Sequence, residues 1–487
     1  MAITLPNESL QEIFSYIQYD KKALHNCLFV NRNWCCNIIP LLWKQPFHFW
    51  KDTNEPSPKL TEVYLNFLSN KSRNRLSVKP YLTLPKPTKP PIFHYPIYLQ
   101  NLDTEKLYLA SRRWLENIEQ FLEDLDYKEY SRALAHELGI LFMEQCKKII
   151  RLEIHHELVI VDYDAEKYWS EERYALLNDN TYTSLPLFIG AKNCLRDLCE
   201  FECHRQRKAG VLLKMAEYCH HIEKLEVSMY NCDELACDVE AEAIGLTYLM
   251  LSQQGLKKFV LSGNKYEWPD VAKSFSSQSK TLTCVDFCDL DFDLICDPLL
   301  ESIALLNSLE KLTFRYCSPF TKQNMTSLCE ASFPYLQTLR FFCSHPPLES
   351  LVQLINNVKN TMIYLAIAPE ISENYVEHVN TLMYLPLVEA CSRIKVLELS
   401  RYFSPESLEY FLKNSRAPIE ILHLGRCWKL NAVHLDVVSE YAKSSNLKLL
   451  NLRFVSKKLP QKRIKHLQSL IEEVITEDSP LKIKRLL

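Results

Sequence analysis

The stretches LEKLTFRYC, residues 309–317, and LQTLRF, residues 336–341, decide the fold. Both follow the template apolar-x-x-apolar-x-apolar, in which x is any residue. The second and third apolar positions are two residues apart, so they face the same side of a short strand. The template therefore predicts a strand with one buried face.

The same template recurs along most of the chain. Nine further copies start at Ile149, Leu195, Ile222, Leu256, Leu282, Met362, Ile394, Ile419 and Leu447. From Leu195 onward the starts are 25–34 residues apart, and most of the intervals are close to 27. Helical patterns such as LESLVQLINNV lie between the copies. Each unit leaves an apolar face that only its neighbours can cover, so stacked units build one continuous core.

This repeat resembles the leucine-rich repeat family, in the longer form whose strand is followed by Cys or Asn. Cys203, Cys317 and Cys427 hold that position here, and other copies are degenerate. The resemblance implies an α/β fold, a curved solenoid with strands on its concave face and helices on its convex face.

The first 43 residues predict three short helices. Asn7, Asp20 and Asn31 are residue types that cap helix N-termini, and Pro40 is expected to end the third helix. Three short helices bury too little apolar surface to be robust alone.

These residues also resemble the F-box family, whose pattern begins Leu-Pro, adds spaced apolar residues and ends with Val-x-x-x-Trp and Leu-Trp. The matching residues are Leu5, Pro6, Leu10, Ile13, Ile17, Leu24, Val30, Trp34, Leu42 and Trp43. F-box modules bind the Skp adaptor of a cullin ubiquitin ligase, so the resemblance implies adaptor contacts at all of these positions except the last two. The alternative is that the helices merely cap the solenoid.

Five segments follow from these patterns. They are an F-box at 1–43, a proline-rich extended connector at 44–102, a helical segment that caps the solenoid at 103–148, about eleven leucine-rich repeats at 149–456, and a C-terminal helical cap with a basic tail at 457–487. HLQSLIEEVI, residues 466–475, is the amphipathic helix expected in the last segment. The acid-rich residues 162–179 are expected to form a surface insertion.

Residues that flank the buried strand positions should form the surface that holds a substrate. Basic and aromatic side chains gather there in the later repeats, and we expect substrate contacts from Arg315, Arg340, Phe342, Tyr364, Arg401, Tyr402, His423, Arg426 and Trp428. Because arginine presents a planar fork to carboxylate or phosphate, the expected target is an acidic or phosphorylated segment. The alternative is a solvated charged face balanced by nearby acids. Earlier repeats place Glu153, Asp197, Glu226 and Asp286 on this face.

The scarcity of glycine excludes several enzyme classes. Only seven glycines occur, and the closest pair, Gly255 and Gly263, is eight residues apart. A dinucleotide-binding fingerprint, a Walker phosphate loop and a serine-hydrolase elbow each need closer pairs. The Cys and His residues of 194–221 lack a Cys-x-x-Cys pair, and the His136-Glu137 and His156-Glu157 pairs lack the second His of a zinc protease. We therefore expect no catalytic residues, no metal and no cofactor.

Together these patterns predict a non-catalytic substrate-recognition subunit of a Skp–cullin–F-box ubiquitin ligase, since the order of the two modules resembles F-box/leucine-rich-repeat receptors, including fungal members. Its partners would be the Skp adaptor, a cullin reached through it, and a protein substrate. The alternative is a repeat scaffold that recruits no ligase; a nucleic-acid regulator acting through the basic tail ranks lower, given a net charge of −3. The absence of a signal-like or membrane-spanning run leads us to expect a cytoplasmic or nuclear protein with reduced thiols.

Overall fold

The computed structural model forms two compact units. The first unit comprises Met1–Val227 and Cys232–Gln254, and the second comprises Ser228–Asn231 and Gly255–Leu487. The structure describes residues 5–18, 20–48, 57–78, 82, 84–86, 91–118, 124–155, 185–204, 210–229, 239–263, 269–293, 298–367, 392–400, 404–426, 430–453 and 459–476.

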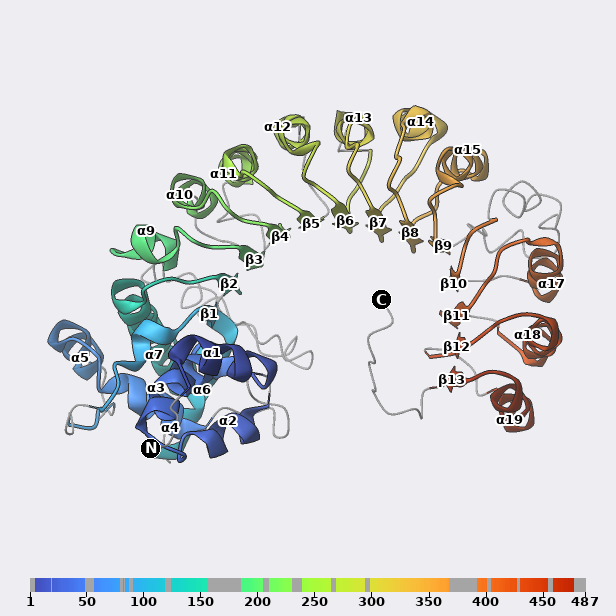
Figure 1. Cartoon of the computed structure of the whole chain (residues 1–487). Coiled ribbons are helices and arrows are strands. Elements are labelled where there is room, and N and C mark those ends of the chain that lie inside the picture. The colour runs from blue at the N-terminus through green and yellow to red at the C-terminus, as the bar shows by residue number, and fades with distance from the viewer. Residues whose placement is uncertain are drawn as a thin grey trace. The chain divides into compact units, whose positions relative to one another are not determined.

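The first unit begins with helices and continues with alternating strands and helices (Figure 1). Its described elements are α1 (Asn7–Tyr16), α2 (Lys21–Cys27), α3 (Arg32–Trp43), η1 (Pro46–His48), α4 (Pro58–Leu65), α5 (Asn70–Ser77), η2 (Tyr95–Tyr98), β1 (Asn101–Asp103), α6 (Thr104–Ile118), α7 (Asp124–Gln145), β2 (Arg151–Ile154), η4 (Leu185–Leu187), α9 (Ala191–Cys194), β3 (Glu200–His204), α10 (Val211–Tyr218), β4 (Lys224–Ser228) and α11 (Val239–Ser252).

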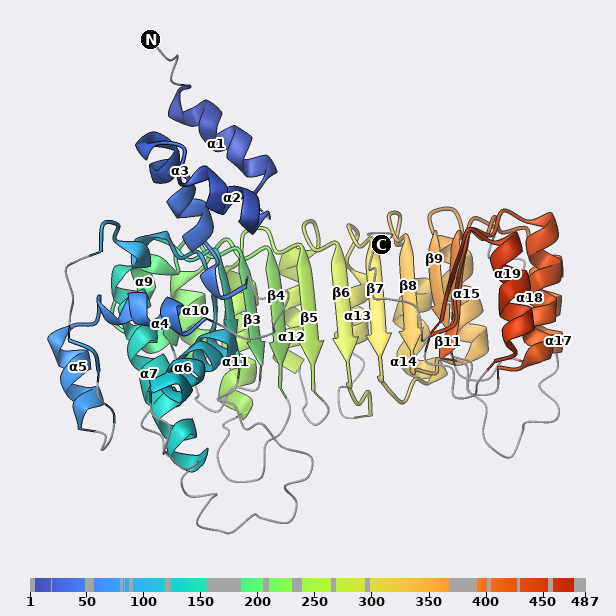
Figure 2. The same ribbon diagram turned by 90° about the horizontal axis from the view of Figure 1, so that it is seen from below.

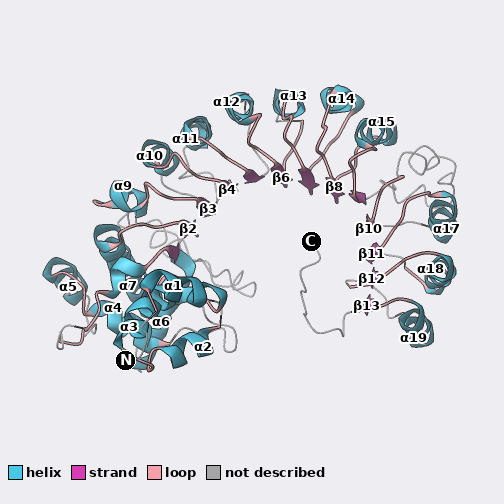
Figure 3. Cartoon of the chain, viewed as in Figure 1, coloured by secondary structure: helices cyan, strands magenta, loops and turns pink. Residues whose placement is uncertain are grey.

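The second unit repeats strand and helix throughout, as the two colours of Figure 3 show. Its described elements are β5 (Lys258–Ser262), α12 (Pro269–Ser274), η5 (Phe275–Gln278), β6 (Cys284–Cys288), α13 (Pro298–Ala304), β7 (Lys311–Arg315), α14 (Lys322–Glu330), β8 (Thr338–Phe342), α15 (Leu348–Val358), β9 (Tyr364–Ile367), β10 (Val396–Ser400), α17 (Pro405–Asn414), β11 (Ile421–Arg426), α18 (Ala432–Ser444), β12 (Leu449–Asn451), α19 (Gln461–Leu470) and β13 (Glu473–Ile475).

The predicted α/β fold class is confirmed. Each of the eleven template copies overlaps one of the strands β2 to β12. Neighbouring strands of the second unit pair in parallel and in chain order, from β5 to β13. In Figure 1 the strands of this unit follow the inner side of a bend and its helices the outer side.

One repeat shows how the template produces this layering. In β7, Leu312 and Phe314 are fully buried, whereas Lys311 and Arg315 at the strand ends are partly exposed. The ring of Phe314 stacks between those of Phe287 and Phe341 from the neighbouring strands, with centroids 5.8 Å and 5.1 Å away. The buried side of the strand therefore joins each repeat to the next.

The structure differs from the expected extended connector. Within residues 44–102 it places the helices α4 and α5 and the short turns η1 and η2. Thr61 of α4 donates a buried hydrogen bond to the carbonyl of Ala110 in α6, at 3.0 Å. Arg75 of α5 pairs with Glu137 of α7 through two hydrogen bonds of 2.6 Å and 2.5 Å. This segment is therefore packed onto the predicted helical segment, which consists of α6 and α7.

The repeats extend beyond their predicted limits at both ends. The short strand β1 precedes the first template copy and pairs with β2, and β13 follows the last copy and pairs with β12. The predicted helix over residues 466–475 is wrong in position, because α19 spans Gln461–Leu470 and Glu473–Ile475 form β13.

The copy that starts at Leu195 is out of register with the structure. Arg151 of β2 pairs with Glu200 of β3, so Ile149 corresponds to Leu198 rather than to Leu195. Asp197 therefore lies before the strand, and Glu202 takes the place beside Glu153. The irregular spacing of apolar residues after Leu195 explains the error.

The acid-rich residues 162–179 lie outside the described residues. Within the described ranges, no helix combines the length and the apolar character that crossing a membrane requires.

Candidate functional site

The first candidate site is the three-helix module of α1, α2 and α3. Figure 2 shows these helices beyond the N-terminal ends of the strands of the first unit. Leu10 and Phe14 of α1, Leu24 of α2 and Ile38 of α3 are buried together. Trp34 adds its ring edge-on to that of Phe14, with centroids 5.1 Å apart. The module therefore has an apolar core of its own.

The helix starts are mostly those expected. The side chains of Asp20 and Asn31 each accept a backbone N–H at 2.9 Å, which confirms both as N-caps. The prediction for Asn7 is wrong, because Asn7 is the first residue of α1 and its Oδ1 accepts a hydrogen bond from Asn37 of α3 at 3.1 Å. That bond joins the first helix to the third.

The third helix does not end at Pro40 but continues to Trp43. A proline costs the helix one backbone hydrogen bond, and here burial of the adjoining Ile38 and Ile39 offsets that cost. Trp43 stacks on Tyr95 of η2, with ring centroids 4.0 Å apart, and meets Tyr64 of α4 edge-on. Trp43 therefore fastens the module to the rest of the first unit.

The structure divides the eight predicted adaptor contacts by burial. Leu10 and Leu24 are 1% and 0% exposed, so they hold the helices together and offer no surface to a partner. Ile17 and Trp34 are half-buried against the same core. The remaining four are exposed and are Leu5, Pro6, Ile13 and Val30.

Two exposed aromatic residues of the module escaped the F-box pattern. Tyr16 is 82% exposed and lies one turn after Ile13 on α1, and Phe29 is 76% exposed and precedes Val30. The sequence could have indicated them, because both are large aromatic residues that lie outside the buried apolar stripe of the short helices. Large apolar side chains left in water on so small a module indicate a docking surface.

The second candidate site is the strand face of the second unit. The parallel register places Thr313 opposite Arg340 and Arg315 opposite Phe342, as the alternation of the template predicts. Arg315 donates from Nε to Oδ1 of Asp286 on β6, at 2.9 Å. Its charge is therefore already balanced by an acid of the preceding strand.

Arg340 is balanced in the same way by Glu398 of β10. Its Nη2 donates to Oε2 of Glu398 at 3.0 Å, and the hydroxyl of Tyr364 donates to the same oxygen at 2.5 Å. The guanidinium of Arg340 also lies over the Tyr364 ring, 5.2 Å from its centroid. Arg315 and Arg340 are thus each paired with an acid. This arrangement is the one expected if the surface is a solvated charged face balanced by nearby acids.

His423 of β11 adds a neutral ring to this face. Burial lowers the pKa of His423, and although the charge of Glu398 raises it, that of Arg340 lowers it again, so that the balance is below the ordinary value. The amide nitrogen of Asn451 lies 3.1 Å from Nδ1 of His423. Since the amide nitrogen can only donate, Nδ1 accepts, as a neutral imidazole allows.

The aromatic residues predicted to contact substrate are mostly covered. Phe342 and Tyr364 are buried, whereas Tyr316, which the sequence analysis did not select, is 53% exposed and meets Phe342 edge-on. Arg401, Tyr402 and Trp428 lie outside the described residues. Arg426 ends β11 opposite Ser400, and its side chain is not among those described.

Several of the cysteines that were considered as zinc ligands are buried. Cys194 and Cys219 are buried, and burial raises the pKa of each thiol to about 12. The same holds for Cys317 at the ladder position. Thiols with such pKa values stay protonated, so these residues act as small apolar groups.

Comparison with known proteins supports the resemblance of the N-terminal helices to an F-box. The F-box-like family model matches residues 2–48. No curated protein sequence matches the chain significantly.

Several solved structures share parts of the fold. A leucine-rich repeat-containing protein, LegL7, from Legionella pneumophila is 14% identical and has a TM-score of 0.34, over 57% of this chain and 83% of the other. An internalin from Listeria monocytogenes is 12% identical and has a TM-score of 0.32, over 59% and 76%. A protein of Bacteroides fragilis is 13% identical and has a TM-score of 0.34, over 53% and 75%. At these TM-scores the three structures add nothing to the argument from the chain's own strands.

The N-terminal helices and the repeated strands thus identify two modules in one chain. The module of α1–α3 is F-box-like and has a closed core with exposed apolar residues. The strands and helices that follow it are leucine-rich repeats. The chain thus joins an F-box-like module to a repeat fold of the leucine-rich-repeat type.

Proposed function

We propose that this chain is the substrate-recognition subunit of a Skp–cullin–F-box ubiquitin ligase. The observation that supports it best is the F-box-like module, whose core is closed while five large apolar side chains remain exposed, namely those of Leu5, Ile13, Tyr16, Phe29 and Val30. F-box domains generally bind the Skp adaptor, and that adaptor joins them to a cullin. These five side chains are the proposed adaptor surface.

In this role the chain acts by position rather than by chemistry of its own. F-box/leucine-rich-repeat folds are typically non-catalytic. The module would hold the ligase and the repeats would hold the target, so the target's lysines meet the charged conjugating enzyme at a high effective concentration. The proposal places the chain in the cytoplasm or the nucleus, where such ligases act.

The proposed target site is the strand face around Arg315 and Arg340, and the proposed target is an acidic or phosphorylated segment. Such a segment would have to exchange with the carboxylates of Asp286 and Glu398, which hold the two arginines now. A phosphate carries more charge and more acceptor oxygens than a carboxylate, which favours this exchange.

Adaptor binding is tested by co-purifying the full chain with the Skp adaptor. The variant Leu5→Ala/Pro6→Ala/Ile13→Ala removes exposed groups only, so we expect it to fold and to lose the complex. Glu12→Ala/Ser15→Ala on the same helix changes exposed polar residues and serves as the matched control, with binding retained. A well-folded wild-type chain that forms no complex would rule out the ligase role and leave a repeat scaffold.

The target site is tested by comparing proteins that co-purify with three forms of the chain. Arg315→Glu/Arg340→Glu should lose them, whereas Asp286→Asn/Glu398→Gln should retain more of them, because the second variant removes the competing carboxylates. Phosphatase treatment beforehand separates phosphorylated from acidic targets. Capture that is equal in all three forms would place the target elsewhere.

A further inference from the structure

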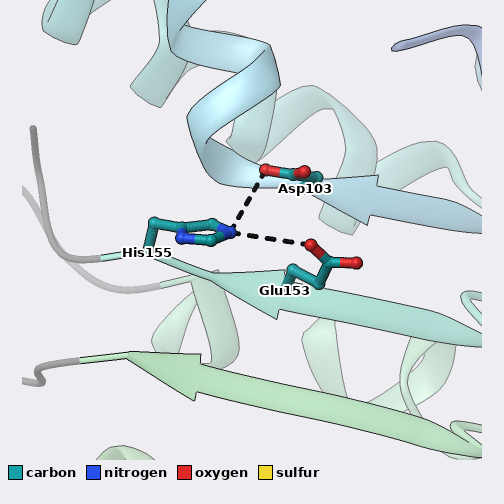
Figure 4. A group of neighbouring side chains, drawn as sticks. All are labelled: Asp103, Glu153 and His155. Atoms are coloured by element: carbon teal, nitrogen blue, oxygen red, sulfur yellow. Dashed lines mark ion pairs between the residues drawn. The ribbon is translucent and has the colours of Figure 1, made fainter. Parts of the chain in front are cut away.

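Three potential metal ligands converge at the edge of the strands of the first unit. Asp103 is the last residue of β1, Glu153 lies in β2, and His155 follows the end of β2. The parallel register places Asp103 opposite Glu153, and His155 lies two residues further on, on the same face. Figure 4 shows the imidazole pointing at both carboxylates.

The distances within this group do not fit hydrogen bonds. Nε2 of His155 lies 3.6 Å from Oδ1 of Asp103 and 3.6 Å from Oε2 of Glu153. Among the described residues, Nε2 is buried and has no hydrogen-bond partner, although it lies within ion-pairing distance of both carboxylates. Ligand atoms bound to one tetrahedral Zn²⁺ at ~2.1 Å are ~3.4 Å apart, close to the separation seen here. Both distances from Nε2 are therefore close to those between ligands of a shared ion, and all three ligand atoms lie within 4.8 Å of one another.

Both carboxylates are already held in place by contacts of their own. Oδ2 of Asp103 pairs with Lys106 at 2.8 Å, and Oδ1 accepts the backbone N–H groups of Glu105 and Lys106 at 3.0 Å and 3.1 Å. Oε1 of Glu153 pairs with Arg151 at 2.5 Å. Oε2 of Glu153 thus faces His155 while Oε1 holds Arg151, and Oδ1 of Asp103 faces His155 while it also accepts two backbone N–H groups.

His155 is oriented by its neighbours as well. Its backbone N–H donates to Oγ1 of Thr104 at 2.9 Å, and Nδ1 lies 3.8 Å from the carboxylate of Glu105. A carboxylate beside the other ring nitrogen is the usual companion of a metal-bound histidine, because it orients the ring. Asp103 and Glu153 are nearly fully buried, which makes a site whose outer contacts are built before any ion arrives.

We propose that Asp103, Glu153 and His155 bind one divalent transition-metal ion of the zinc type, with water completing the coordination. One imidazole nitrogen with two carboxylate oxygens suits Zn²⁺ better than Mg²⁺ or Ca²⁺, which prefer oxygen alone. The ion would join the end of β1 to the end of β2. No metal was expected from the sequence, where the motifs sought were a Cys-x-x-Cys pair and a zinc-protease pair. Glu153-x-His155 matches neither motif, and Asp103 lies 50 positions away from Glu153.

A second group beside it offers a natural comparison. Glu202, His204 and Glu226 also converge, and the His204 ring stacks on that of His155 with centroids 4.8 Å apart. Glu202, however, pairs with both Arg151 and Lys224, and Lys224 also approaches Glu226 at 3.8 Å. In the first group Lys106 and Arg151 contact the oxygens that do not face His155, whereas in the second group Arg151 and Lys224 share Oε1 of Glu202, so the ion is assigned to the first group.

The experiment uses the full chain, stripped with chelator and titrated with Zn²⁺ in a calorimeter. We expect one site per chain, with affinity reduced at least ten-fold in Glu153→Gln and in His155→Ala. Glu226→Gln, the matched control in the second group, should bind like the wild type, and Mg²⁺ should not compete. Circular dichroism of each stripped variant shows that the fold is retained.

Cobalt substitution identifies the ligand atoms, since the chain also carries 18 cysteines. Co²⁺ bound at the proposed site should show the visible bands of a nitrogen and oxygen site, which His155→Ala removes. A strong near-ultraviolet charge-transfer band would mean thiolate ligands and would overturn the proposal. So would the loss of binding in Glu226→Gln with retention in His155→Ala, or no binding at all by a folded chain.

Discussion

At the scale of single residues, the pair of Arg75 and Glu137 shows how one contact sets a pH dependence. Burial alone would raise the pKa of Glu137, but contacts with His136, Arg75 and Ser72 lower it to about 2. A carboxyl whose pKa is lower in the folded state stabilises the fold fully above its ordinary pKa of about 4.5. That stabilisation disappears as the pH falls from there toward 2.

Arg75→Gln should therefore lower the free energy of unfolding by about 1–3 kcal/mol at pH 7, with the lower values favoured because Arg75 is 40% exposed. The difference from the wild type should shrink between pH 5 and pH 2, and urea denaturation along that range measures it. Lys71→Gln on the same helix removes an exposed charge and should change little. A loss in Arg75→Gln that is independent of pH would contradict the assignment.

A second residue-scale prediction concerns Gly263, which has a φ of +139°. A Cβ at this position would lie far inside contact distance of the Met229 carbonyl, and backbone cannot move aside easily. Gly263→Ala should thus lower the free energy of unfolding by about 2–4 kcal/mol. At Gly255 a Cβ meets nothing within 4 Å, so Gly255→Ala should stay within about 1 kcal/mol of the wild type. Equal losses would show that the backbone at Gly263 tolerates a side chain.

At the scale of elements, the strands were predictable and the connector was not. Each template copy is a local alternation of apolar residues, so eleven strands could be located from the sequence. The strands β1 and β13 escaped because Thr104 and Thr476 stand where the template has its third apolar residue. Prolines were misread as helix breakers, although Pro58 is the first residue of α4, where the missing N–H costs nothing.

The candidate sites were likewise predictable only in part. Their strand positions follow from the alternation. The acids that pair with Arg315 and Arg340, and Asp103 beside His155, come from other strands and are set by the register. Burial is also a property of the assembled helices, and for that reason the F-box pattern did not distinguish Leu10 from Ile13.

Helix α1 provides a prediction from that distinction. Leu10→Ala leaves a cavity in the module's core and should reduce its stability by about 2–4 kcal/mol. Ile13→Ala alters an exposed position and should change it by about 0.5 kcal/mol at most. Hydrogen exchange of residues 7–43 in the full chain measures both. If Ile13→Ala loosened the module as much as Leu10→Ala, the described burial of α1 would be wrong.

At the scale of the whole molecule, the proposed adaptor and target surfaces belong to different compact units. The two binding activities should therefore be separable. Leu5→Ala/Pro6→Ala/Ile13→Ala should lose the Skp adaptor and keep its targets, and Arg315→Glu/Arg340→Glu should do the reverse. Paired co-purification of the adaptor and the targets checks this. A folded variant that loses both partners would mean that the two activities depend on each other.

The stacked rings of Phe287, Phe314 and Phe341 have a geometric consequence for the second unit. Their centroids are 5.8 Å and 5.1 Å apart, whereas paired strands are spaced by ~4.8 Å and packed helices by ~8–10 Å. Each repeat is thus a wedge, thin at its strand, thicker at its rings and thickest at its helix. The opening across the inner face depends on the angle of these wedges, so one smaller buried ring would alter the reach of every surface residue on either side of it.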